Sequence, residues 1–250
     1  MTRRPSASGA LLIVNADDLG YAPEVSRGIV EALAFGVVTS ATLLVNGPDA
    51  ASAAELARGR AVGLHVNLAR WAPLSAGYPE EWLAGGALDE AKAGQLSARL
   101  VKTEVEAQLA RFEALMKAPP THLDVHKHLH RHPAVLEGVC AVAAARSLPV
   151  RSIDAAMRAA VRRFGVRTNL HFVGDAGAEA YWTLPRLRAL LPALPRDGVC
   201  ELMCHPGYAP VQVRSGYSAQ REVERATFLS QEAKDLVERL GPARGNWAAV

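Results

Sequence analysis

Histidines are concentrated in one short stretch of the chain, since five of the eight lie between His122 and His132. Leu123 and Val125 alternate there with polar residues, which indicates a short strand running into a loop. Pro133 then begins a helical pattern, as proline does in a first turn. Imidazole is a common metal ligand and titrates near neutral pH. The density of histidines therefore indicates a metal-binding or catalytic site, with a solvated basic loop as the alternative.

The spacing of three of these histidines limits what they can bind together. In an extended backbone His126, His128 and His130 share one face. A rise of about 3.3 Å per residue would separate neighbours by roughly 7 Å and the outer pair by roughly 13 Å. One histidine, or two adjacent ones, could therefore bind an ion, and the others would line the site.

Two adjacent carboxylates follow another strand. The apolar run 11–14 is typical of a buried parallel strand, and Asp17 and Asp18 come shortly after it. One carboxylate could bind a hard cation while the other accepts a proton; the alternative is a polar turn in which an aspartate caps a helix. His65 lies inside the alternating stretch 62–68, where a hydrogen-bonded structural histidine is the alternative to a ligand.

A further histidine, His205, follows the apolar stretch 199–204 and precedes Pro-Gly. Cysteines do not form a disulfide framework, because their number is odd. On one strand Cys200 and Cys204 would lie roughly 13 Å apart, too far to share a zinc ion. We expect these two and Cys140 to be buried thiols.

Strands and helices alternate about seven times, which predicts a single-domain parallel α/β fold. The expected strands are 11–14, 39–45, 62–68, 123–125, 149–152, 168–173 and 199–204, and the expected helices are 23–35, 50–58, 96–117, 134–146, 155–164, 184–194 and 220–240. A TIM-like (β/α) barrel fits better than an open sheet, because it gathers the carboxyl ends of all strands at one mouth. We expect the barrel over residues 11–250 after a disordered tail, residues 1–10.

Net charge, apolar runs and missing motifs argue against several classes of function. The net charge of +3 is small and dispersed, which argues against a nucleic-acid partner. No apolar run approaches 18 residues, so no membrane span is expected. The N-terminus lacks a signal-peptide pattern, which favours the cytoplasm, and neither G-x-G-x-x-G nor a P-loop suggests a nucleotide. For the oligomeric state, a homodimer is the alternative to a monomer.

Four ordered motifs together resemble the YdjC-like carbohydrate deacetylases: Asn15–Gly20 (NADDLG), Gly63–Leu68 (GLHVNL), Thr121–His126 (THLDVH) and Glu201–Tyr208 (ELMCHPGY). The resemblance covers nearly the whole chain. It implies a distorted (β/α) barrel and removal of an acetyl group from an N-acetylated sugar. Sequence and resemblance thus agree on the fold class.

The resemblance also implies roles for residues. Asp18, His65 and His126 match the metal ligands, Asp17 matches the general base, and His205 is the candidate acid. One divalent ion is expected, Mg²⁺ or Zn²⁺, with Mn²⁺ or Co²⁺ as further alternatives, because mixed nitrogen and oxygen ligands suit all four.

The chain departs from the family pattern at two positions. Lys127 stands where family members often have the middle of three histidines, which leaves the ligand His126 in place and changes the substrate contacts. Leu19 replaces a common phenylalanine, a packing change.

The long segment from Trp71 to Gly94 has little periodicity, and we interpret it as a lid or substrate wall.

Aromatic residues offer a way to hold a sugar. The candidates for stacking on sugar rings are Trp71, Tyr78, Trp82 and Tyr208, with packing against the barrel as the alternative. Two rival functions stay open: a metal-dependent sugar isomerase or epimerase, and a non-catalytic sugar-binding protein.

Overall fold

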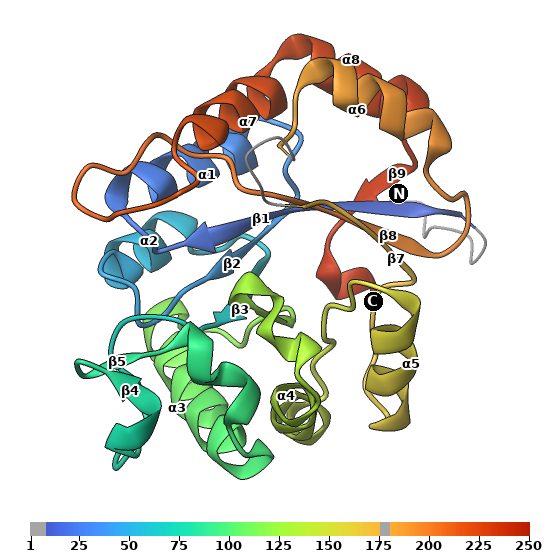
Figure 1. Cartoon of the computed structure of the whole chain (residues 1–250). Helices are drawn as coiled ribbons and strands as arrows, with labels where there is room; N and C mark the ends of the chain where they lie inside the picture. Colours follow the sequence, from blue (N-terminus) through green and yellow to red (C-terminus); the bar gives the residue numbers. More distant parts are fainter. Residues whose placement is uncertain (1–8, 176–180) are drawn as a thin grey trace.

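A curled parallel sheet forms the centre of the computed structural model, which describes residues 9–175 and 181–250 (Figure 1). Its strands are β1 (Leu11–Leu19), β2 (Ser40–Leu43), β3 (Val62–Val66), β6 (Leu123–Val125), β7 (His171–Val173), β8 (Val199–Cys204) and β9 (Ala243–Gly245). The order is β6-β3-β2-β1-β8-β7, with every pair parallel, and β9 pairs with the start of β1. The parallel barrel-like sheet expected from the sequence is confirmed.

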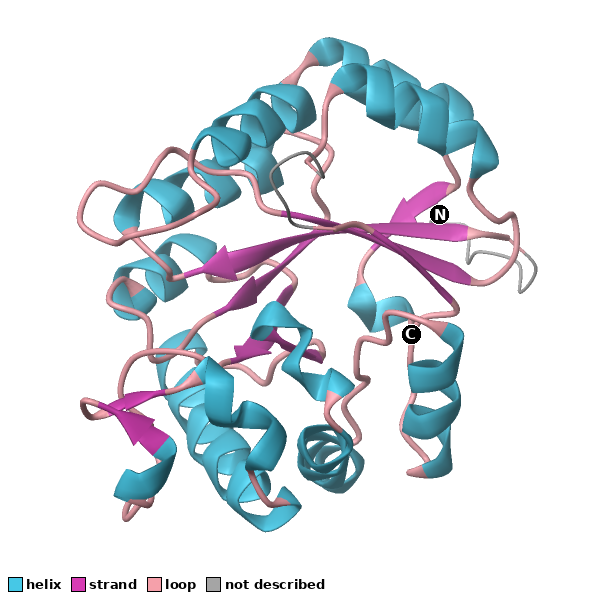
Figure 2. Ribbon diagram, in the orientation of Figure 1, coloured by secondary structure: helices cyan, strands magenta, loops and turns pink. Residues whose placement is uncertain are grey.

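Helices surround the sheet on its outside (Figure 2). They are α1 (Pro23–Phe35), α2 (Ala50–Ala57), α3 (Ala98–Met116), α4 (Pro133–Arg146), α5 (Ala155–Arg163), α6 (Leu184–Leu190), α7 (Ala219–Leu229) and α8 (Gln231–Leu240). A small hairpin of β4 (Leu83–Ala84) and β5 (Ala87–Leu88) lies apart from the sheet, and short 3₁₀ turns cover Glu80–Trp82, Glu90–Gln95, His126–Arg131, Leu191–Ala193 and Trp247–Ala249. No described helix has the length and apolarity that a membrane crossing requires.

The barrel is distorted because the sheet stays open between its edge strands. Within the described residues β6 and β7 do not pair with each other. The segment after α4 continues the curve from β6 through a single parallel bridge between Leu123 and Val150. The strand expected at 149–152 is thus reduced to one bridge.

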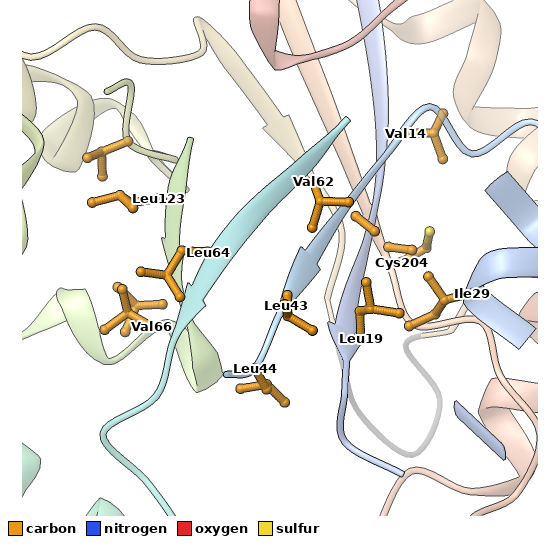
Figure 3. Packing of buried hydrophobic residues seen from close by; sticks show 14 of the residues in the cluster. Val14, Leu19, Ile29, Leu43, Leu44, Val62, Leu64, Val66, Leu123 and Cys204 are labelled. Carbon is orange, nitrogen blue, oxygen red and sulfur yellow. The ribbon is translucent and has the colours of Figure 1, made fainter. Parts of the chain in front are cut away.

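The two faces of the sheet differ, because one is apolar and the other carries polar side chains. Leu12, Val14 and Ala16 of β1 are fully or almost fully buried in the apolar core, which Figure 3 shows continuing from Ile29 of α1 across the sheet to Leu64. Each such side chain contributes roughly 1.5–3 kcal/mol through burial. Because side chains alternate along a strand, the intervening residues of β1 face the inside of the barrel, where polar groups gather.

Apart from the strand expected at 149–152, the observed elements match the expected ones closely, with a further error near the C-terminus. The helix expected at 220–240 is two helices, α7 and α8, because Ser230 is extended (φ −64°, ψ 148°) and its hydroxyl accepts a hydrogen bond from the backbone of Ala233. Serine favours such a cap over a helix interior. The three cysteines are buried free thiols, as expected. Most of the expected N-terminal tail, residues 1–8, lies outside the described residues.

Candidate metal centre and active site

A cavity of about 530 Å³ opens at the carboxyl ends of the strands. Asp17 and Asp18 reach it from β1, His65 from β3, and His126 and His205 from the residues that directly follow β6 and β8. All five residues proposed from the sequence line this one cavity. The parallel strands bring them together because their carboxyl ends share one edge of the sheet.

An irregularity in β1 allows two consecutive carboxylates to reach the same cavity. The pairing of β1 with β2 shifts register between Ala16 and Leu19, and Asp18 has a left-handed backbone with φ 74°. Aspartate tolerates this conformation better than most residues, and a bulge redirects the side chains at a strand end. The alternation that would send Asp18 outward is therefore broken at this position.

Asp18, His65 and His126 form a compact cluster. Oδ1 of Asp18 lies 3.3 Å from Nε2 of His65 and 3.0 Å from Nδ1 of His126, and these two nitrogens are 3.2 Å apart. Ligands at tetrahedral positions around an ion with bonds of 2.0–2.1 Å would be about 3.3 Å apart. Among the described residues none gives this Oδ1 a well-oriented hydrogen bond. The cluster fits a single divalent ion.

His65 is fixed from its other side. Its Nδ1 lies 2.7 Å from Oδ1 of Asp124, and the hydroxyl of Thr42 donates a hydrogen bond of 3.1 Å to the other oxygen of Asp124. Burial alone would lower the pKa of His65, but the Asp124 carboxylate outweighs it and raises the pKa to about 10. A carboxylate on one imidazole nitrogen leaves the other oriented for a metal.

Arg151 occupies the middle of the polar interior. Its guanidinium is fully buried and donates to both oxygens of Asp17 at 2.6 and 2.7 Å, and it lies 2.8 Å from Asp124 and 2.7 Å from Glu201. Burial would raise the pKa of Asp17, but the Arg151 charge holds it well below its usual range. Burial dominates at Glu201 and raises its pKa to about 7 against the effect of Arg151.

His205 is held by groups from α7 and the preceding loop. Its backbone N–H donates to Glu224 at 2.5 Å, the hydroxyl of Tyr217 donates to the same carboxylate at 2.7 Å, and the Tyr217 ring lies edge-on to the imidazole at 5.3 Å. Nδ1 of His205 is buried with no hydrogen-bond partner among the described residues. Burial lowers the pKa of His205 to about 4, so its ring is neutral at pH 7.

The histidine stretch differs from its expected extended form. Residues 126–131 form 3₁₀ turns, with Lys127 and His128 in left-handed conformations at φ 56° and 54°. The assumed alternation is therefore lost, and only His126 joins the cluster. His128 lines the cavity, whereas His130 is buried outside it.

Two other members of that stretch have structural contacts. His122 stacks on Trp247 with ring centroids 4.3 Å apart, which ties the C-terminal turn to the barrel. Lys127, at the position of the family histidine, lines the cavity and forms an ion pair with Glu90. Glu90 is the one residue of the segment 71–94, all of it described, that lines the cavity.

The aromatic residues expected to stack on a sugar take their alternative role. Within the described structure none of the four candidates lines the cavity; Trp71 packs edge-on against Tyr21 at 5.4 Å, and Tyr208 packs against two arginine side chains. Tyr21 and Tyr217 line the cavity instead.

The residues that contact and orient the five site residues were not predicted from the sequence. Asp124 and Glu201 lie within the quoted motifs, on the face of their strands that alternation turns toward the barrel interior. Arg221 and Glu224 are three residues apart on the buried face of α7. Charged residues at such core-facing positions are the signal that could have found them.

Comparisons with known proteins agree with this arrangement. The family model of YdjC-like protein matches residues 11–239. Chitooligosaccharide deacetylase of Yersinia pestis (strain Pestoides F) is 35% identical over 95% of this chain and 98% of its own length, and that of Yersinia pseudotuberculosis serotype O:1b (strain IP 31758) matches equally.

Solved structures share the fold. A protein of Enterococcus faecalis V583, named as a candidate for cellobiose-phosphate cleavage, superposes with a TM-score of 0.86 at 29% identity, over 96% of this chain and 98% of its own. The Xyl-CE4 domain of a termite-hindgut metagenome xylanase has a TM-score of 0.52 at 9% identity over 94% of this chain and 86% of its own, a likeness of fold alone. From the family match and the curated relatives, the chain belongs to the YdjC-like protein family.

Proposed function

We propose that this protein is a divalent-metal-dependent carbohydrate N-deacetylase, which hydrolyses the acetamide of an N-acetylated sugar. One observation carries the proposal: the Asp18-His65-His126 cluster lies in the same cavity as a second carboxylate, Asp17, and a buried imidazole, His205. Relatives named chitooligosaccharide deacetylase support the substrate class. The cavity of about 530 Å³ is within the size range of small-molecule sites.

Asp18, His65 and His126 would hold the ion. A divalent ion bound there would supply Lewis-acid polarisation of the amide carbonyl and would lower the pKa of a water molecule. The mixed nitrogen and oxygen donors suit Mg²⁺ or Zn²⁺, and also Mn²⁺ or Co²⁺.

Asp17 would accept the proton of the attacking water. Arg151 keeps this carboxylate ionised and in a fixed orientation, with both oxygens engaged at 2.6 and 2.7 Å. The same pairing makes Asp17 a weak base. Asp17 would act as the proton acceptor, and a divalent ion bound at the neighbouring cluster would supply the acidity of the water.

His205 would deliver a proton to the nitrogen as the carbon–nitrogen bond breaks, which releases acetate and the amino sugar. Because the pKa of His205 is lowered to about 4 by burial, the ring is neutral at pH 7 before substrate binds. It would therefore take up a proton from solvent during turnover and pass it to the departing amine, while Asp17 would return to solvent the proton that it accepted from the water. Glu224, through the His205 backbone, and Tyr217 hold the ring in the cavity.

The test is acetate release from a panel of N-acetylated sugars that includes N,N′-diacetylchitobiose, with each candidate metal added separately. The proposal expects acetate and a free amine in equal amounts. Conversion of an aldose to a ketose without acetate would favour the isomerase alternative. Calorimetric sugar binding with no product under any metal would favour a non-catalytic sugar-binding protein.

Three further predictions belong to this function. We expect the enzyme in the cytoplasm, where cell fractionation would find its activity, and we keep a homodimer as a prediction that light scattering of the purified protein would check. The segment 71–94 is proposed to influence acceptor preference through Glu90, its residue at the cavity.

A further inference from the structure

Arg221 of α7 contacts the proposed ligand Asp18 directly. Its Nη2 donates to Oδ2 of Asp18 at 2.5 Å, and its side chain is almost fully buried beside the cavity. The other oxygen, Oδ1, is the one that faces His65 and His126. The two oxygens of this carboxylate are therefore divided between a fixed cation and the metal cluster.

The surroundings of Arg221 hold it in this position. The guanidinium carbon lies 5.3 Å from the centre of the Tyr21 ring and 5.7 Å from that of Tyr217. Its Nε and Nη1 have no hydrogen-bond partner among the described residues. The backbone is fixed as well, because the carbonyl of Arg221 accepts a hydrogen bond of 3.1 Å from Gly207, two residues after His205. Asp18 is thus the one carboxylate in the described structure with which this buried cation pairs.

Charge explains why a cation is useful there. Without an ion and without Arg221, the buried carboxylate of Asp18 would face only the imidazoles of His65 and His126, and a buried charge that is poorly compensated is costly. With an ion, the same guanidinium is a like charge close to a divalent cation and opposes its binding. Arg221 should therefore stabilise the metal-free protein more than the metal-bound protein.

We propose that Arg221 is a positioning residue that acts through Asp18 as its internal counter-ion: it holds Oδ2, leaves Oδ1 as the single oxygen offered to an ion, and balances the carboxylate while the ion is absent. The inference rests on the proposed metal-dependent function. It predicts that Arg221 stabilises the metal-free protein and lowers the affinity of the site for metal.

The experiment compares wild type with Arg221→Gln, Arg221→Lys and the control Arg225→Gln. Gln removes the charge and keeps a donor, whereas Lys keeps the charge. Arg225 lies one turn along α7 and pairs with Glu31 at 2.8 Å, away from the cluster. Each protein is titrated with Co²⁺ by calorimetry, and thermal unfolding is recorded with and without saturating Co²⁺.

For Arg221→Gln we expect a melting temperature several degrees below wild type without Co²⁺, most of that difference removed by Co²⁺, and a Co²⁺ affinity about 10-fold tighter, by Coulomb's law. Arg221→Lys should remain close to wild type in both measurements. Arg225→Gln should show the same shift with and without Co²⁺ and an unchanged affinity.

Several results would overturn the inference: a loss of stability in Arg221→Gln that Co²⁺ does not reduce, weaker or unchanged Co²⁺ binding, or a lysine variant no closer to wild type than the glutamine variant. If Arg221→Gln folds only when Co²⁺ is present, the inference holds; if it fails to fold in both conditions, the residue is merely structural. Failure of wild type itself to bind Co²⁺ would instead refute the metal site of the proposed function.

Discussion

Asp17 and Asp18 are neighbours in the chain, yet each carboxylate is held by a different buried arginine. Arg151 binds both oxygens of Asp17 at 2.6 and 2.7 Å, and Arg221 binds one oxygen of Asp18 at 2.5 Å. The left-handed backbone of Asp18 (φ 74°) allows this separation. Both oxygens of Asp17 therefore contact an arginine, whereas Asp18 keeps one oxygen directed at the histidines. This difference is the physical basis for assigning the two carboxylates different roles.

Loss of either proposed proton-transfer group should impair turnover without emptying the metal site. Asp17→Asn and His205→Ala should each lower kcat by roughly 10²–10⁴-fold, the usual contribution of a general acid or base. Metal content, measured by atomic emission on the purified variants, should stay near that of wild type. If His205 is the acid, His205→Ala should damage amide substrates more than activated esters, whose leaving groups need little protonation.

Two outcomes would change these roles. Loss of metal from Asp17→Asn would mean that the roles of Asp17 and Asp18 are exchanged. Equal damage by His205→Ala to amides and activated esters would indicate that His205 binds the oxyanion or the sugar.

Removal of Arg151 should destabilise the fold strongly. Arg151→Met would leave Asp17, Asp124 and Glu201 buried without their shared cation, and breaking a buried pair typically costs about 3–5 kcal/mol. Urea denaturation measures the loss. The control is Arg146→Met, which removes an ion pair to Glu113 between largely exposed side chains and should cost under about 1 kcal/mol. Equal free energies of unfolding for the two variants would contradict the assigned role.

Much of this organisation could be predicted from sequence because it depends on local patterns. The bounds of α1 (Pro23–Phe35) and β8 (Val199–Cys204) follow directly from a 3.6-residue period and from an apolar run. The five site residues lie at or just after the carboxyl ends of strands, and a parallel sheet brings these ends together whatever lies between them.

The rest depends on contacts that are distant in sequence. Arg151 is 134 residues from Asp17, and Arg221 is 203 residues from Asp18, so no local pattern relates them. The left-handed conformations of Lys127 and His128 are equally hard to predict, because residues other than glycine seldom adopt them without support from the surrounding structure. Tertiary packing decides these features, and they control how the predicted residues are oriented.

Protonation of buried His130 should make the protein less stable in acid. Burial, followed by the charges of Arg151 and Arg131, lowers the pKa of His130 from 6.5 to about 3. Between these values the unfolded chain binds a proton that the folded protein does not, so the free energy of unfolding falls as pH decreases through this window.

His130→Met should reduce that dependence by about 1.4 kcal/mol per pH unit between about pH 4 and 6, one proton's share. Urea denaturation at several pH values measures it, with His132→Met at an exposed position as the control. An unchanged pH dependence in His130→Met would show that this imidazole is protonated in the folded protein.

Chelation followed by reconstitution tests the central claim most directly. Wild type and His126→Ala are stripped of metal with a chelator and titrated with Zn²⁺, and acetate release from N,N′-diacetylchitobiose is followed at each addition. We predict that stripped wild type releases no acetate, that activity returns and saturates at one equivalent, and that His126→Ala needs about 10-fold more metal or stays inactive. Full activity of wild type without bound metal, or identical titrations for the two proteins, would contradict a metal centre built on Asp18, His65 and His126.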